Sequence, residues 1–315
     1  MSLALADKAL ELCLREVSAT SKAYAYLQQT MIRFWLGDLE GAEAHFTIGL
    51  KFFDDTAFRR NKIGSPLAAF AHGSWIAWTL GRADAARERL DQMMTAVNAD
   101  NPHDLAMASD CASILQSMLR DYEQAEASAL LALELSEKRQ FPNEAALARC
   151  ALGHARAGLG RTTEGILLIR QGIAGKLEYG HRLEITRDLG FLTDAQASAG
   201  AVADALETVK QALCANLEEI AYRPEALRLR GELWRRQGDA KQAEGDFREA
   251  IANAQTMRAK GWELRATTSL ARLLASKDRR DEARKMLAEI YNWFTEGFDT
   301  PDLKDAKALL DELRA

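Results

Sequence analysis

The sequence predicts an all-α protein, built as a right-handed solenoid of about seven helix hairpins with a period of about 40 residues. Three observations predict this fold. The chain of 315 residues is 48% hydrophobic and has only 5 Pro. The abundant residues Ala, Leu, Glu and Arg are good helix formers, and β-branched residues never alternate as they do in strands. Finally, one turn motif recurs along the whole chain.

The recurring motif is a turn such as "QGDAKQA" at 237–243, which ends on a small residue early in a second helix. Equivalent turns place small residues 38–44 positions apart, at Ala42, Ala86, Ala125, Gly165, Ala205, Ala243 and Ala283. Twelve residues earlier every copy is small again, at Thr30, Ser74, Ser113, Gly153, Thr193, Gly231 and Ala271. Small residues at a crossing let two antiparallel helices approach to about 8 Å. The motif therefore predicts tightly packed hairpins that bury their apolar faces against their neighbours.

The hairpins account for residues 21–295, and a helix is expected at each end of the array. Residues 1–20 are expected to form either half of a repeat from a longer, cut array or an N-terminal cap. Residues 300–315 are expected to form a capping helix, with Thr300 as N-cap and Pro301 at the first helical position. Its acidic residues, including Asp302 and Asp305, are off the apolar stripe, so we expect them on a polar outer face. The whole chain, 1–315, is then a single domain.

The spacing of small residues, with Trp234 and Phe247 at aromatic positions, resembles the tetratricopeptide repeat. The repeat here is longer than the usual 34 residues. HEAT-type repeats have this length and stay the alternative, although they do not require the small residues.

A second resemblance is carried by "RPEALRLRGELWRRQGD" at 223–239, "WELRATTSLARL" at 262–273 and "WFTEGFDT" at 293–300. These segments are similar to the C-terminal repeat region of large bacterial signalling ATPases. Such proteins carry an adenylate/guanylate cyclase or DNA-binding domain, then a STAND-type ATPase, then the repeats. The repeats of the maltose-regulon transcriptional activator are more distantly similar. The resemblance implies that this chain is a regulatory array, and it brings no catalytic residue with it.

The tetratricopeptide resemblance also implies that the first helix of each hairpin lines a concave groove. The expected groove residues are aromatic or apolar in the N-terminal half and charged in the C-terminal half: Tyr24, Met31, Phe34, Trp35, Trp75, Trp78, His154, Arg187, Arg228 and Arg235. The same positions include Asp110, Asp194, Glu232, Arg265 and Arg272. Aromatic residues with Arg nearby are typical of binding hot spots, while packing of the aromatics between repeats is the alternative. We expect a protein or peptide segment, a small-molecule effector or a second copy of the chain as the partner.

Several classes of function are disfavoured by composition and motifs. The net charge of −5 disfavours nucleic acid and anionic membranes as partners. No apolar run is long enough for a bilayer span and the start is not a signal peptide, so we expect a cytoplasmic protein. The 4 Cys and 5 His are scattered, and no phosphate-binding loop or hydrolase motif is present. We therefore expect no cofactor, no metal and no catalysis. Two hypotheses remain: a sensor module of a cyclase-type protein, and a free-standing adaptor.

Overall fold

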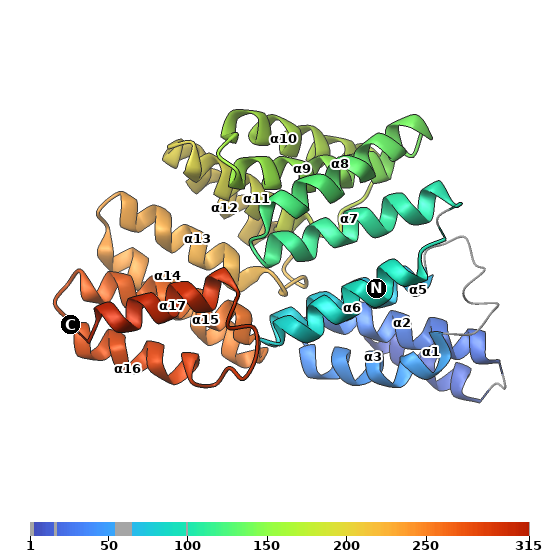
Figure 1. The fold of residues 1–315 in the computed structure, drawn as a ribbon, viewed down its shortest axis with the longest axis horizontal. Coiled ribbons are helices and arrows are strands. Elements are labelled where there is room, and N and C mark those ends of the chain that lie inside the picture. The colour runs from blue at the N-terminus through green and yellow to red at the C-terminus, as the bar shows by residue number, and fades with distance from the viewer. Residues whose placement is uncertain (1–2, 16–17, 54–64, 99, 315) are drawn as a thin grey trace.

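The computed structural model describes residues 3–15, 18–53, 65–98 and 100–314, and within these ranges the chain forms sixteen α-helices and turns (Figure 1). The first helices of seven hairpins are α2 (Ala19–Trp35), α5 (Ser65–Thr79), α7 (Pro102–Met118), α9 (Pro142–Gly158), α11 (Ile185–Ser198), α13 (Arg223–Arg236) and α15 (Lys260–Ala275). The second helices are α3 (Leu39–Phe53), α6 (Ala83–Ala96), α8 (Tyr122–Lys138), α10 (Thr162–Glu178), α12 (Val202–Ala215), α14 (Ala240–Thr256) and α16 (Arg280–Tyr291). Helices α1 (Leu3–Leu14) and α17 (Pro301–Glu312) flank the array. The expected all-α solenoid of hairpins is confirmed.

Each hairpin turns through one residue with positive φ. These residues are Gly37 (76°), Gly81 (88°), Arg120 (60°), Gly160 (87°), Gly200 (79°), Gly238 (84°) and Asp278 (61°). Glycine is favoured there because it has no Cβ to clash in the left-handed region. The next backbone N–H then turns back to satisfy a carbonyl at the end of the first helix, as Asp38 N–H does to Arg33 O at 2.9 Å. The turns therefore lie where the motif predicts them.

Small residues mark the closest approach of paired helices, as expected. Six of the anchor residues are alanines with no exposed surface: Ala42, Ala86, Ala125, Ala205, Ala243 and Ala283. Between α9 and α10, a Cβ on Gly153 would lie 2.6 Å from the carbonyl oxygen of Gly165. Between α13 and α14, a Cβ on Gly231 would lie 2.5 Å from the ring of Phe247. These two crossings have no room for a larger side chain.

The solenoid closes on itself, so that α5 packs against α15 (Figure 1). The backbone carbonyl of Trp35, at the end of α2, accepts a hydrogen bond of 2.9 Å from the N–H of Ile220. The indole of Trp78 on α5 meets that of Trp262 on α15, with ring centroids 4.6 Å apart at 72°. The N-terminal hairpins are thus covered by residues that lie far along the sequence.

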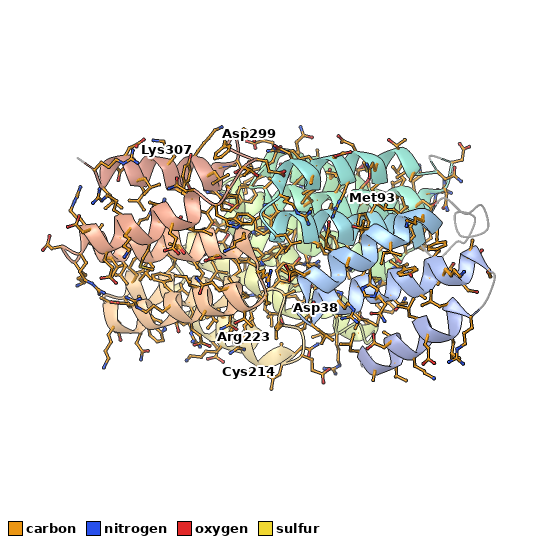
Figure 2. All side chains as sticks on the ribbon, turned by 90° about the horizontal axis from the view of Figure 1, so that it is seen from below. Asp38, Met93, Cys214, Arg223, Asp299 and Lys307 are labelled. Carbon is orange, nitrogen blue, oxygen red and sulfur yellow. The ribbon has the colours of Figure 1, made fainter. Side chains whose placement is uncertain are left out.

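Polar contacts from the loop between α16 and α17 complete this closure. The Glu296 carboxylate accepts hydrogen bonds from the N–H groups of Asp84 (2.9 Å) and Ala85 (3.2 Å), in the first turn of α6. A carboxylate is favourable at a helix N-terminus, where backbone N–H groups lack partners. The Arg87 guanidinium pairs with Asp299 at 3.0 Å, and Figure 2 shows Asp299 where the C-terminal helices meet the N-terminal ones.

The closure corrects the expectation of an accessible aromatic surface in the groove. Four of the expected contact residues are buried: Phe34, Trp35, Trp75 and Trp78. The rings of Phe34 and Trp35 have centroids 6.3 and 6.0 Å from that of Tyr222, which comes from the other end of the closed solenoid. These side chains are therefore core, and the core they form joins distant hairpins as well as neighbouring ones.

The two flanking helices are held by their nearest hairpins. On α1, the Asp7 carboxylate accepts a 2.9 Å hydrogen bond from the Gln29 amide of α2 and pairs with Arg33 at 3.0 Å. Helix α17 begins as expected, with Thr300 at the N-cap and Pro301 in the first turn. The Thr300 hydroxyl, however, donates to the Gly297 carbonyl at 2.7 Å and caps no helix N–H.

Candidate functional site

The first helices of the C-terminal five hairpins surround a cavity of about 270 Å³, called the inner cavity below. Its wall is formed by residues of α7, α9, α11, α13 and α15, by the start of α8 and by the start of α17. The wall combines charged side chains with aromatic ones such as Phe191 and Trp262. Ligand sites in proteins are concave surfaces of this kind, with a few convergent polar groups.

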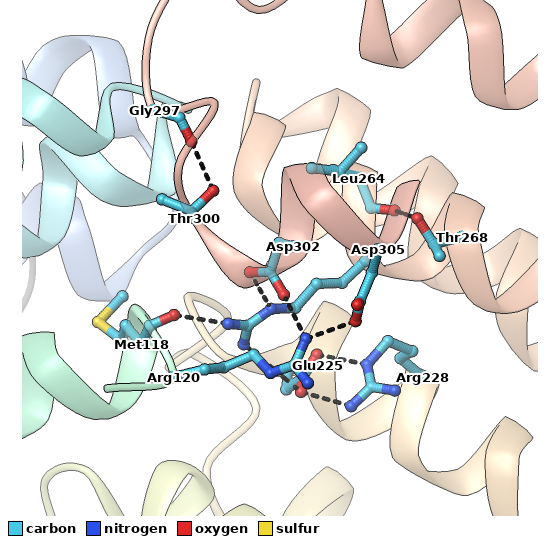
Figure 3. A network of polar contacts seen from close by, with 11 residues as sticks. Met118, Arg120, Glu225, Arg228, Leu264, Thr268, Gly297, Thr300, Asp302 and Asp305 are labelled. Carbon is cyan, nitrogen blue, oxygen red and sulfur yellow. Dashed lines mark hydrogen bonds and ion pairs between the residues drawn. The ribbon is translucent and has the colours of Figure 1, made fainter. Parts of the chain in front are cut away.

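An ion-pair network forms the side of the inner cavity next to α17 (Figure 3). The Arg265 guanidinium pairs with Asp302 at 2.8 Å and also donates to the carbonyl of Met118 at 2.5 Å. The Arg120 guanidinium pairs with Asp305 at 2.7 Å and with Asp302 at 3.4 Å. Asp302 and Asp305 therefore face inward, which corrects the expectation that they lie on the outer face of α17.

Helix α13 adds a second pair to the same wall, and its carboxylate also lies 3.9 Å from the Arg265 guanidinium. The Arg228 guanidinium donates two hydrogen bonds to the Glu225 carboxylate, of 2.8 and 2.7 Å (Figure 3). Burial raises the pKa of Glu225, but the positive charges of Arg228 and Arg265 outweigh it, so the pKa is lowered. The carboxylate is therefore ionised, and Arg228 is held in one orientation by a charge-assisted, two-point contact.

Helices α9 and α11 contribute an imidazole and a carboxylate to the wall. The His154 ring on α9 stacks on Phe191 of α11, with centroids 3.9 Å apart and planes at 6°. Its Nε2 lies 3.6 Å from a carboxylate oxygen of Asp194, which is too long for a hydrogen bond. Burial raises the pKa of Asp194, yet His154, Arg228 and Arg265 together lower it by more, so this carboxyl is also ionised. The Asp194 side chain remains 41% exposed, which makes it available to a ligand.

Buried polar atoms without partners also occur in this wall. Ser117 Oγ, His154 Nδ1 and Thr186 Oγ1 are buried and have no hydrogen-bond partner among the described residues. All three residues line the inner cavity and are at most 7% exposed. Leaving a buried polar group unsatisfied costs about 1–3 kcal/mol. Polar ligand atoms or ordered water in the inner cavity would remove that cost.

Arg187 lines the inner cavity, but its guanidinium pairs with carboxylates that lie behind the cavity wall. Its guanidinium pairs with Glu184 at 2.8 Å and with Asp188 at 3.0 Å. The Lys176 ammonium, which is fully buried, reaches the same Asp188 at 2.5 Å. Nearby, burial raises the pKa of Asp110 to about 7. This cluster joins α7, α10 and α11 and holds Arg187 in place.

The sequence-predicted site residues are therefore divided by the structure. His154, Arg187 and Arg228 line the inner cavity. Arg235 lies outside it and pairs with Glu232 at 2.8 Å. Tyr24 and Met31 are half-buried residues of α2, away from this cavity. Asp194, Arg265 and Arg272, which occupy equivalent groove positions in α11 and α15, do line it.

Sequence reasoning did not assign the residues that come from the hairpin turn and from the last helix. Arg120 stands at a positive-φ position where five of the seven hairpins have Gly. A large side chain in the left-handed region is uncommon and costs roughly 1 kcal/mol or more. The arginine at position 120, where most copies of the turn have glycine, was therefore a sign in the sequence that this residue has a role of its own. No local pattern indicated that Asp302 and Asp305 would reach it.

The described residues contain no cluster of His, Cys, Asp and Glu that is placed to hold a metal ion. Within the same part of the chain, every helix is too short or too polar to cross a bilayer.

Comparison with known proteins identifies the fold. No protein-family model matches the sequence, and no curated protein matches it significantly. The fold is similar to that of a Rap protein complexed with competence and sporulation factor, with a TM-score of 0.64 and 15% identity over 94% of this chain and 80% of that one. NprR in complex with its cognate peptide NprX gives a TM-score of 0.59, with 11% identity over 92% and 82%. A tetratricopeptide repeat protein from Parabacteroides merdae gives 0.50, with 12% identity over 93% and 99%. The chain thus has a tetratricopeptide-like α-solenoid fold.

Proposed function

We propose that this chain is a non-catalytic binding module that takes its ligand into the inner cavity. The observation that carries the proposal is the wall of that cavity, where ionised side chains stand beside buried polar atoms that lack partners. Two proteins with a similar fold support it, since one was solved with competence and sporulation factor and the other with a cognate peptide. The groove residues His154, Arg187 and Arg228 belong to this proposed site. The buried aromatic residues of α2 and α5, which are Phe34, Trp35, Trp75 and Trp78, do not.

We further propose that the module regulates a larger bacterial signalling protein of the cyclase and STAND ATPase type. The support is the sequence resemblance of 223–239, 262–273 and 293–300 to the repeat region of such proteins. The alternative is a free-standing adaptor that binds peptide segments of other proteins. The coding sequence upstream of Ala4 separates the two: an ATPase domain there supports the regulatory function, and its absence supports the adaptor.

The cavity itself can be tested by filling it. Gly190 on α11 lines the inner cavity, and a Cβ built on it meets no atom within 4 Å. Gly190→Leu should therefore fill the space without straining the fold. Gly245→Leu is the matched control, because Gly245 is an exposed helical glycine on α14 whose Cβ also meets nothing within 4 Å.

The measurement is a thermal-shift screen of unmodified peptides and metabolites on the wild-type chain and both variants. We expect ligands that stabilise the wild type to stabilise Gly245→Leu equally and to lose their effect on Gly190→Leu. Ligands that stabilise both variants alike would show that the inner cavity is not the binding site.

A further inference from the structure

The charges in the wall of the inner cavity are almost all matched within the protein. Three arginines pair with three carboxylates, so that this part of the wall is neutral: Arg120, Arg228, Arg265, Glu225, Asp302 and Asp305. Arg187 is neutralised behind the wall by Glu184 and Asp188. A ligand charge bound to one of these groups would compete with the partner that the group already has, and displacing that partner would leave its charge uncompensated.

Two charged groups of the inner cavity remain for a ligand. On α11, Asp194 has a single ion-pair contact among the described residues, the long one to His154 at 3.6 Å. On α15, the guanidinium of Arg272 has no ion-pair partner in the described part of the chain, and its side chain is exposed at the cavity wall. One unmatched acid and one unmatched base favour a ligand that carries both signs of charge.

The two groups are separated by a helix. Helix α13 packs against both α11 and α15 and lies between them in the order of the first helices. The axes of neighbouring helices in such packing are roughly 8–10 Å apart. The axes of α11 and α15, which carry Asp194 and Arg272, are therefore about two such spacings apart, and both side chains point toward the inner cavity. A free amino acid, whose two charged groups are one residue apart, is shorter than two such helix spacings. An extended peptide advances about 3.3–3.6 Å per residue, so about three to five residues span the distance.

The wall of the inner cavity also carries groups that suit a peptide backbone, on α7 and at the start of α11. Ser117 and Thr186 each present a buried hydroxyl without a partner, and a hydroxyl can both donate to a carbonyl and accept from an N–H. A dicarboxylate would meet the like charge of Asp194, and a diamine would meet that of Arg272. Both pairings are unfavourable for groups of the same sign at short range.

We propose that the ligand of the inner cavity is a short, unblocked peptide of about three to five residues. Its amino terminus lies at Asp194 and its carboxy terminus lies at Arg272. This inference rests on the proposed function, since it names the ligand class of the same site. It assigns Asp194 and Arg272 as the residues that select free peptide ends.

The test uses four pools of random peptides, three to five residues long: unmodified, N-acetylated, C-amidated and modified at both ends. Binding to the full chain is measured by isothermal titration calorimetry and thermal shift. Each charge-assisted contact that is lost should weaken binding about tenfold to a hundredfold. We therefore expect the unmodified pool to bind best and the doubly modified pool to bind worst.

Two variants assign the ends. Asp194→Asn should abolish the preference for a free amino terminus and retain that for a free carboxy terminus, and Arg272→Gln should do the reverse. The matched controls are Asp281→Asn and Arg284→Gln, because these two residues pair at 3.4 Å on α16, where Asp281 is 99% exposed. Neither control should change either preference.

Three outcomes would overturn the inference. Modified pools could bind as well as the unmodified pool, or one variant could remove both preferences together. In the third outcome, no peptide pool binds. A metabolite instead raises the melting temperature of the wild-type chain and of Gly245→Leu, but not that of Gly190→Leu. That result would reject a peptide ligand and leave the proposed function standing. If every ligand that binds the wild-type chain binds Gly190→Leu equally well, the inner cavity is not the binding site and the proposed function fails as well.

Discussion

The crossing of α9 and α10 gives the sharpest prediction about stability. Gly153 lies at this crossing, and a Cβ there would be 2.6 Å from Gly165 O, 2.7 Å from Ile169 Cγ1 and 2.9 Å from Ile169 N. Two of these three atoms belong to the backbone, which cannot rotate away as a side chain can. Gly153→Ala must therefore push the two helices apart.

The size of the effect follows from two opposing contributions. Replacing a helical glycine by alanine stabilises the helix by about 1 kcal/mol. Overpacking of a tight core costs about 1–3 kcal/mol, and rigid backbone neighbours place Gly153 in the upper part of that range. We expect a net loss of about 1–2 kcal/mol. Gly190→Ala, made in the open space of the inner cavity, should instead gain about 0.5–1 kcal/mol.

The two variants make a matched pair, since the same substitution is made in the first helix of consecutive hairpins. Urea unfolding followed by circular dichroism gives the free energies, and hydrogen exchange shows whether the loss is local to α9 and α10. For a chain of this size class, 1 kcal/mol corresponds to roughly 2–4 °C in melting temperature. A Gly153→Ala variant at least as stable as Gly190→Ala would refute the assignment of this crossing.

Two further predictions concern the closure and the buried carboxyl group. Trp78→Ala should cost about 3–5 kcal/mol and enlarge the radius of gyration in solution scattering, because Trp78 packs on Trp262. Tyr179→Ala is the control, since Tyr179 is a 56% exposed aromatic residue at the end of α10. Equal behaviour of the two variants would contradict the closure. Burial raises the pKa of Asp110 to about 7, above its unfolded value of about 3.9. The folded chain therefore holds a proton that the unfolded chain releases, and this contribution to stability is complete below about pH 4 and is lost as the pH rises towards 7. Asp110→Asn should flatten the fall in stability between about pH 4 and 7, and an unchanged slope in urea titrations would count against the raised pKa.

The parts of the fold that repeat locally could be predicted from the sequence. Each hairpin turn and each close crossing depends on residues within about twenty positions of one another, and small residues such as Ala243 and Gly231 recur at those positions. The fate of the aromatics could not be predicted in this way. Trp78 suits both a recognition surface and a core, and its burial depends on Trp262, which only the curvature of the whole array brings near.

The site was predictable in part for the same reason. His154 and Asp194 occupy equivalent positions of consecutive first helices, so the repeat alone places them on one wall. Helix periodicity also separated Asp302 from the apolar stripe of the last helix. It could not show which polar side of that helix faces inward, because that depends on how α17 packs on α15.

The contact between the two ends of the array changes how such a protein should fold. In an open solenoid each repeat touches only its neighbours, so unfolding can start at a frayed end and spread in steps. Here α5 packs on α15, and the backbone N–H of Ile220 donates a hydrogen bond to the carbonyl of Trp35. Forming these contacts requires a loop of nearly two hundred residues to close, which costs entropy before any contact is gained. Refolding should therefore be slower than in an open array of equal length. Once both ends have met, neither is free to fray, and the chain should lose its structure in one cooperative transition.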